Sequence, residues 1–108
     1  MLDISERKIA QVVLMAHEMH RAEGELRAFI DALNEDEAAS LVALYWIGRG
    51  AYEPEELEEA KATALREATA PTSDYLLGSP HMADHLEAGI EALGLEIVDD
   101  EDDLMRGV

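Results

Sequence analysis

The chain has 108 residues, of which 25 are acidic and 8 are basic, giving a formal net charge of −17 at pH 7. This length is enough for one compact domain with its own core. The charge argues against binding to nucleic-acid phosphates or to anionic membrane surfaces, because no cluster of Lys and Arg can neutralise them. The absence of cysteine excludes disulfides, thiol catalysis and cysteine-based zinc sites.

The sequence also bears on the compartment in which the protein resides. Its first residues lack a basic segment followed by an apolar one, so no secretory signal is expected. The longest apolar run, Leu41 to Ile47, has seven residues, whereas about 20 are needed to span a bilayer. We expect a cytoplasmic protein without a membrane partner.

Two helices are predicted in the first third of the chain. Ser5 is a suitable N-cap for a helix that runs to about Ala22. Gly24 interrupts the pattern and marks either a break between helices or a kink in one long helix. The predicted first apolar face comprises Ile9, Val12, Val13, Ala16, Met19 and His20, and the second comprises Leu26, Phe29, Ile30 and Leu33.

The stretch NEDEAASLVALYWIGRG, residues 34–50, predicts a central buried helix over about 35–47. Asn34 can cap it, and Glu37 can complete a capping box. Seven consecutive apolar or aromatic residues cover its whole circumference, which is typical of a helix buried on all sides. Gly48 and Gly50 then indicate its end, with Arg49 favourable at the negative end of the helix.

Two further helices and a short helical segment are predicted after residue 50. Pro54 is expected at the first position of the next helix. On its outer side Glu58 and Lys61 can form a weak surface pair. Its predicted inner residues are Leu57, Ala60, Ala64, Leu65 and Ala68. The segment 72–78 is long enough for one or two turns.

Ser79 and Pro80 indicate the start of the last helix, and Gly94 its end. Its predicted inner face is formed by Met82, Leu86, Gly89, Ile90 and Leu93. No strand-like alternation occurs. The sequence predicts an all-α fold, a compact bundle of five or six helices, with a single domain over 1–98 and a flexible acidic tail over 99–108.

The four histidines form two pairs with helical spacing. His17 and His20 are three residues apart, and His81 and His85 are four apart. Both spacings place two imidazoles on neighbouring turns, as in helices that chelate a transition metal such as zinc. Whether the pairs converge depends on a helix crossing that the sequence does not specify, and core or surface histidines are the alternative. No other cofactor is expected.

Three residues at the end of the central helix are candidates for an interface. Tyr45 and Trp46 are aromatic types enriched at binding hot spots, and Arg49 follows them. Packing in the core is the alternative for the two aromatic residues. No motif of a known catalytic type is present.

The blocks WIGRG and DYLLGSP, within the stretches 26–50 and 72–94, resemble a family of short bacterial proteins. This family is domain of unknown function 3775, found mainly in proteobacteria. The resemblance implies an all-helical single domain and no known activity. It implies apolar or aromatic residues near positions 81 and 85, where this chain has His81 and His85, which weakens the metal hypothesis. It also favours a break at Gly24.

Three functional hypotheses follow from these observations. The first is a non-enzymatic protein that acts through protein contacts, including self-association. The second is a metal-binding or metal-dependent protein that uses the four histidines. The third is an acidic mimic of nucleic acid that occupies a basic protein, which requires carboxylates spaced like phosphates.

Overall fold

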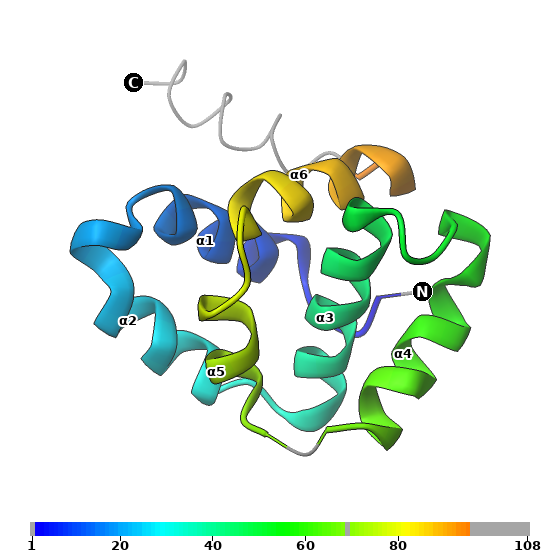
Figure 1. Ribbon diagram of the computed structural model, residues 1–108, viewed down its shortest axis with the longest axis horizontal. Helices are drawn as coiled ribbons and strands as arrows, with labels where there is room; N and C mark the ends of the chain where they lie inside the picture. Colours follow the sequence, from blue (N-terminus) through cyan, green and yellow to red (C-terminus); the bar gives the residue numbers. More distant parts are fainter. Residues whose placement is uncertain (1, 69, 96–108) are drawn as a thin grey trace.

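The fold is seen in a computed structural model that describes residues 2–68 and 70–95. Over these residues the chain forms six α-helices and one 3₁₀ turn, and no strand (Figure 1). The predicted all-α fold is therefore confirmed. The helices are α1 (Glu6–His17), α2 (Met19–Asp31), α3 (Glu35–Arg49), α4 (Leu57–Arg66), α5 (Thr72–Leu77) and α6 (Met82–Leu93), with the turn η1 (Pro54–Glu56) before α4. The predicted boundary at residue 98 and the predicted acidic tail lie outside the described residues.

The first third of the chain forms two helices as predicted, but the break between them is at Glu18 and not at Gly24. Ser5 caps α1 as predicted, accepting a hydrogen bond from the backbone N–H of Lys8 at 3.2 Å. However, α1 ends at His17, and Glu18 adopts a non-helical conformation before α2 begins. Gly24 lies inside α2, so the predicted break there was wrong. The turn at Glu18 reorients the chain, and His20 is exposed rather than central to the apolar face.

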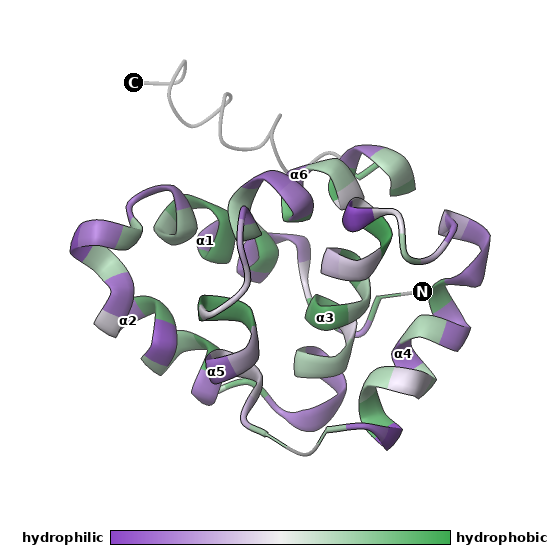
Figure 2. Ribbon diagram, viewed as in Figure 1, coloured by the Kyte–Doolittle hydropathy of each residue, from purple (hydrophilic) through white to green (hydrophobic). Residues whose placement is uncertain are grey.

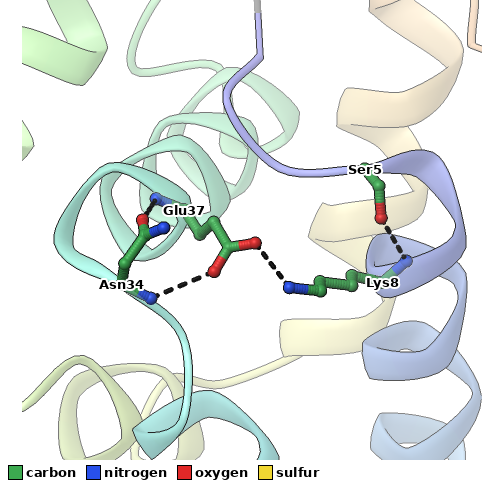
Figure 3. Close-up of polar contacts among 4 residues, drawn as sticks. All are labelled: Ser5, Lys8, Asn34 and Glu37. Atoms are coloured by element: carbon green, nitrogen blue, oxygen red, sulfur yellow. Dashed lines mark hydrogen bonds and ion pairs between the residues drawn. The ribbon is translucent and has the colours of Figure 1, made fainter.

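The central helix α3 forms as its local sequence predicts. The side chain of Asn34 accepts from the backbone N–H of Glu37 at 2.8 Å, and the Glu37 carboxylate accepts from the N–H of Asn34 at 3.0 Å (Figure 3). The helix is buried along most of its length. It ends at Gly50, whose φ of 89° is left-handed. Gly48 does not end the helix, which continues to Arg49.

The segment after α3 differs from the prediction in two respects. Pro54 begins the short turn η1, and α4 starts only at Leu57. Lys61 is buried, and its ammonium lies 3.0 Å from the carboxylate of Asp3 and 3.2 Å from that of Glu58, both of which are exposed. The expected pair of Glu58 and Lys61 therefore forms, but its lysine is not on the surface. Leu65, predicted to face inward, is 46% exposed. Helix α4 turns so that Ala60, Lys61 and Ala64 are its buried residues.

The last helix also starts later than predicted. Ser79 does not cap it; instead its hydroxyl donates to the carbonyl of Tyr75 at 2.7 Å. The residue before α6 is His81, which has a left-handed backbone with φ 55°. The buried residues Met82, Leu86, Gly89 and Ile90 match the predicted inner face, and Gly94 ends the helix with φ 71°.

Helix α3 is the centre around which the other elements are arranged. In Figure 1, α4 lies on one side of α3, α5 and the α1–α2 pair lie on the other, and α6 crosses one end. Hydrophilic residues dominate the start of α3 and the turn η1 (Figure 2). Among the described residues, no helix is long and apolar enough to span a bilayer.

The crossing of α3 and α6 depends on two glycines. A Cβ atom at Gly48 would lie 1.6 Å from the carbonyl oxygen of His85. A Cβ atom at Gly89 would lie 2.4 Å from the carbonyl oxygen of Leu44. The two backbones are therefore in direct contact, and neither position has room for a side chain.

Candidate protein-binding groove

One side of α3 lines an open groove that α4 and the start of α5 bound. Val42, Trp46 and Arg49 are spaced four and three residues apart, so they form one stripe along the helix. The stripe faces α4 and the start of α5 across a groove of about 510 Å³. We call this the aromatic groove; it is lined by Val42, Trp46, Arg49, Ala51, Tyr52, Thr63, Ala64, Glu67, Ala68, Ala70, Thr72 and Tyr75.

Trp46 is held between two tyrosines. Its ring stacks on that of Tyr52, with centroids 5.7 Å apart and an interplanar angle of 25°. Its indole N–H donates to the hydroxyl of Tyr75 at 2.8 Å. Tyr75 is 38% exposed, and Trp46 and Tyr52 are half-buried. The indole is therefore fixed in position while part of its surface remains open to the groove.

Tyr45 has a different environment from Trp46. It is only 1% exposed, and its hydroxyl lies 3.4 Å from the carbonyl oxygen of Pro80. Its ring makes edge contacts with Tyr75 at 6.2 Å and with His85 at 5.4 Å. The Arg49 guanidinium lies over the same ring, 5.3 Å from its centroid. Of the three predicted interface residues, Trp46 and Arg49 thus line the groove, and Tyr45 belongs to the core.

Two aromatic residues of the groove were missed in the sequence. Tyr52 follows the left-handed Gly50, which turns the chain back so that Tyr52 reaches the ring of Trp46. The position of Gly50 near Trp46 was a usable signal for this contact. Tyr75 comes from α5, 29 residues further along the chain, and no local pattern indicates its hydrogen bond to Trp46.

A second hollow of about 390 Å³ adjoins the aromatic groove. The two share Ala64, Ala68, Ala70 and Thr72, whose side chains are small. The second hollow continues along α3 toward its start, past Ala38 and Ala39 to Asn34 and the end of α2. Together they form a channel lined largely by apolar and small residues beside α3.

The predicted histidine pairs have separate environments. His17 lies 3.0 Å from Glu87 of α6, and both side chains are exposed. The rings of His81 and His85 lie 6.3 Å apart and nearly perpendicular, and His85 also contacts Tyr45. Within the part of the chain that the structure describes, no group of three or more His, Asp or Glu residues is placed to hold a metal ion.

Two polar contacts join α2 to α5 beside the groove. The hydroxyl of Ser73 is buried and donates to the carboxylate of Asp31 at 2.5 Å. Arg27 and Asp74 form an ion pair between the same two helices. These contacts fix α5, and with it Tyr75, relative to the rest of the molecule.

Comparison with known proteins agrees with the resemblance noted in the sequence. Neither the curated proteins nor the solved structures contain a match to this chain. The model of the family described as protein of unknown function (DUF3775) matches residues 23–95. The match begins inside α2 and ends after α6, so it includes α3 and every residue of the aromatic groove. The chain is therefore a member of the DUF3775 family.

Proposed function

We propose that this chain is a non-enzymatic cytoplasmic protein that binds a basic segment of another protein in the aromatic groove. The observation that carries the proposal is the position of the aromatic residues. Three of the five in the chain, Trp46, Tyr52 and Tyr75, surround one groove and remain partly exposed. Rigid aromatic side chains around a groove are typical of the centres of protein interfaces.

The charge around the groove favours a basic partner. Glu67 lines the groove itself, at the end of α4. The turn η1 and the residue before it, which follow Tyr52 in the chain, add three exposed acidic residues, namely Glu53, Glu55 and Glu56. Complementary charge steers association and excludes wrong partners. A Lys or Arg side chain can also bind to the face of an aromatic ring, which suits the exposed part of Trp46.

The polar residues of the groove support binding rather than catalysis. They are Arg49, Thr63, Glu67 and Thr72, together with the hydroxyl groups of the two tyrosines. General acid–base catalysis commonly uses a pair of titratable groups with different roles. Among the groove residues that the structure describes, Glu67 is the single carboxylate, and none is histidine.

Trp46 provides a direct test because it is the only tryptophan of the chain. Two synthetic peptides with the same apolar pattern are compared, one with Lys and Arg at its polar positions and one with Glu. We expect only the basic peptide to shift the emission of Trp46 in a saturable way, and added salt to weaken its binding. A response to neither peptide, or an equal response to both, contradicts the proposal.

A pair of matched variants locates the binding. Glu67→Lys reverses a charge in the groove, and Glu59→Lys makes the same change on the exposed side of α4. We expect Glu67→Lys to weaken the basic peptide at least tenfold, and Glu59→Lys to weaken it about twofold through the change in net charge alone. Equal losses for the two variants would show that binding depends on overall charge rather than on the groove.

A further inference from the structure

A second surface, at the other end of the molecule, carries the most exposed large hydrophobic residue described. Leu14 of α1 is 52% exposed. It lines a hollow of about 340 Å³ with residues of α1 and α2, and a second hollow of about 590 Å³ lies beside it. The hollows share Met15 and Glu25, so they form one surface. We call it the α1–α2 surface; it is lined by Arg7, Lys8, Gln11, Leu14, Met15, Glu18, Arg21, Ala22, Glu25, Ala28 and Phe29.

The charge of this region differs from that of the rest of the chain. Residues 1–33 contain four basic and six acidic residues, whereas residues 34–108 contain four basic and nineteen acidic residues. Two copies of so acidic a chain repel each other over most of their surfaces. Residues 1–33, which include the α1–α2 surface, carry a net charge of only −2, so this repulsion is weaker there.

The surface also carries both signs of charge, as a two-fold interface requires. In such an interface the same patch meets itself, so each cation needs an anion within the same patch. Lys8 and Arg21 are already paired within the chain, with Glu37 at 2.6 Å and with Glu18 at 3.3 Å. Arg7 of α1 and Glu25 of α2 line the same hollow beside the apolar Met15 and Phe29.

We propose that two copies of this chain associate through their α1–α2 surfaces in a two-fold dimer. Leu14 and Phe29 form the apolar centre, and Arg7 of each copy faces Glu25 of the other. The surface lies at the end of the molecule away from α4, so the dimer leaves the aromatic groove open (Figure 1). Arg7 and Leu14 also precede residue 23, where the match to the family model begins.

The mass in solution tests this proposal. We expect sedimentation velocity at about 150 mM salt, where long-range repulsion is screened, to give twice the chain mass of 11.9 kDa as concentration rises. Leu14→Glu should weaken dimerisation at least tenfold, as expected for an apolar residue at the centre of an interface. Leu65→Glu is the matched control, because Leu65 is similarly exposed, on α4, and the added charge is the same. We expect this variant to dimerise as the wild type does.

Charge reversal tests the orientation of the two copies and does not depend on the Leu14 variant folding. Arg7→Glu and Glu25→Arg should each weaken the dimer, because like charges then meet across the two-fold axis. A mixture of the two single variants should form heterodimers, and the double variant should recover the homodimer. A wild type that stays monomeric at the highest concentration, equal losses for Leu14→Glu and Leu65→Glu, or no recovery in the double variant would each overturn the proposal.

Discussion

The two sides of α3 differ in the space that they leave for side chains. Against α6, Gly48 lies in direct backbone contact, and an added Cβ would be 1.6 Å from a carbonyl oxygen. Toward α4, Trp46 and Arg49 face a groove of about 510 Å³. Trp46 and Gly48 are two residues apart, which is roughly 200° around a helix, so they lie on opposite sides. One helix therefore makes direct backbone contact with α6 on one side and lines an open groove on the other.

This difference separates residues that specify the fold from residues that are available for binding. On the α6 side, the contact requires the absence of side chains, and any larger residue is excluded. On the groove side, large aromatic residues keep part of their surface in solvent, where they add less to packing than a fully buried residue does. We therefore expect substitutions on the α6 side to change stability most, and substitutions on the groove side to change binding more than stability.

The largest effect is expected for Gly48→Ala. The new methyl group must displace the backbone of His85, which moves α6 away from α3. We expect a loss of about 3 kcal/mol in the free energy of unfolding, at the upper end for overpacking of a core. Urea denaturation followed by circular dichroism measures this loss.

Gly24→Ala is the matched control for that variant. Gly24 also lies inside a helix, α2, but a Cβ atom added there would meet no neighbouring atom within 4 Å. We expect this variant to be more stable than the wild type by about 0.5–1 kcal/mol, since alanine is the better helix former. If Gly48→Ala were also stabilising, α3 and α6 could not be in backbone contact.

A smaller effect is expected for Asn34→Ala, which acts on both sides of α3 alike. The variant loses the oxygen that accepts from the N–H of Glu37 at 2.8 Å. We expect a loss of about 1 kcal/mol in urea denaturation, and no change in the affinity of the folded protein for the basic peptide. Asn34→Asp retains an oxygen in the same place and should stay close to the wild type. A lower peptide affinity in Asn34→Ala would show that the groove depends on the start of α3.

A still smaller effect on stability is expected for Tyr75→Phe, on the groove side. This variant removes the acceptor of the indole N–H of Trp46, which then has water as an alternative partner. We expect a loss of about 0.5 kcal/mol and a change in the emission of Trp46 in the folded state. Tyr52→Phe keeps the stacked ring and serves as the control. If Tyr75→Phe lost several kcal/mol in the free energy of unfolding, the groove side of α3 would contribute to stability as the α6 side does, and the distinction between the two sides would be wrong.

Features of α3 were predictable from sequence because their causes are local. The capping box joins residues three apart, the buried circumference follows from consecutive apolar residues, and Gly50 ends the helix by its own conformation. The stripe of Val42, Trp46 and Arg49 follows from helical spacing alone. The close contact at Gly48 was not predictable, because a glycine near the end of a helix is equally typical of a C-cap.

The errors occurred where tertiary contacts override local pattern. The break between α1 and α2 occurs at Glu18, which is neither glycine nor proline, while the glycine at position 24 is helical. Lys61 is buried because Asp3, 58 residues away in sequence, provides a carboxylate for its ammonium. Burial of the ammonium lowers the pKa of Lys61, but the hydrogen bonds to Asp3 and Glu58 outweigh burial and raise this pKa above its ordinary value. No periodicity of a single helix contains this information.

The smallest effect is expected at Glu37, whose contribution depends on pH. The ammonium of Lys8 donates to its carboxylate at 2.6 Å, and the N–H of Asn34 donates at 3.0 Å, which together hold the pKa of Glu37 below its ordinary value of 4.5. A lowered pKa in the folded state stabilises the protein while the group is charged, and this stabilisation is lost as the pH falls through the lowered value.

Glu37→Gln isolates this contribution. The difference in free energy of unfolding between wild type and Glu37→Gln should be constant above about pH 5.5 and should shrink as the pH falls below 4.5. In a Lys8→Met background the shrinkage should be smaller, because the strongest cause of the lowered pKa is then absent. If the difference in free energy of unfolding between wild type and Glu37→Gln did not vary with pH, this would contradict the ion pair of Lys8 in α1 with Glu37 at the start of α3. Since Lys8 is exposed and salt screens the pair, its effect should stay below that of Gly48→Ala, which places close packing above charge pairing in holding α3.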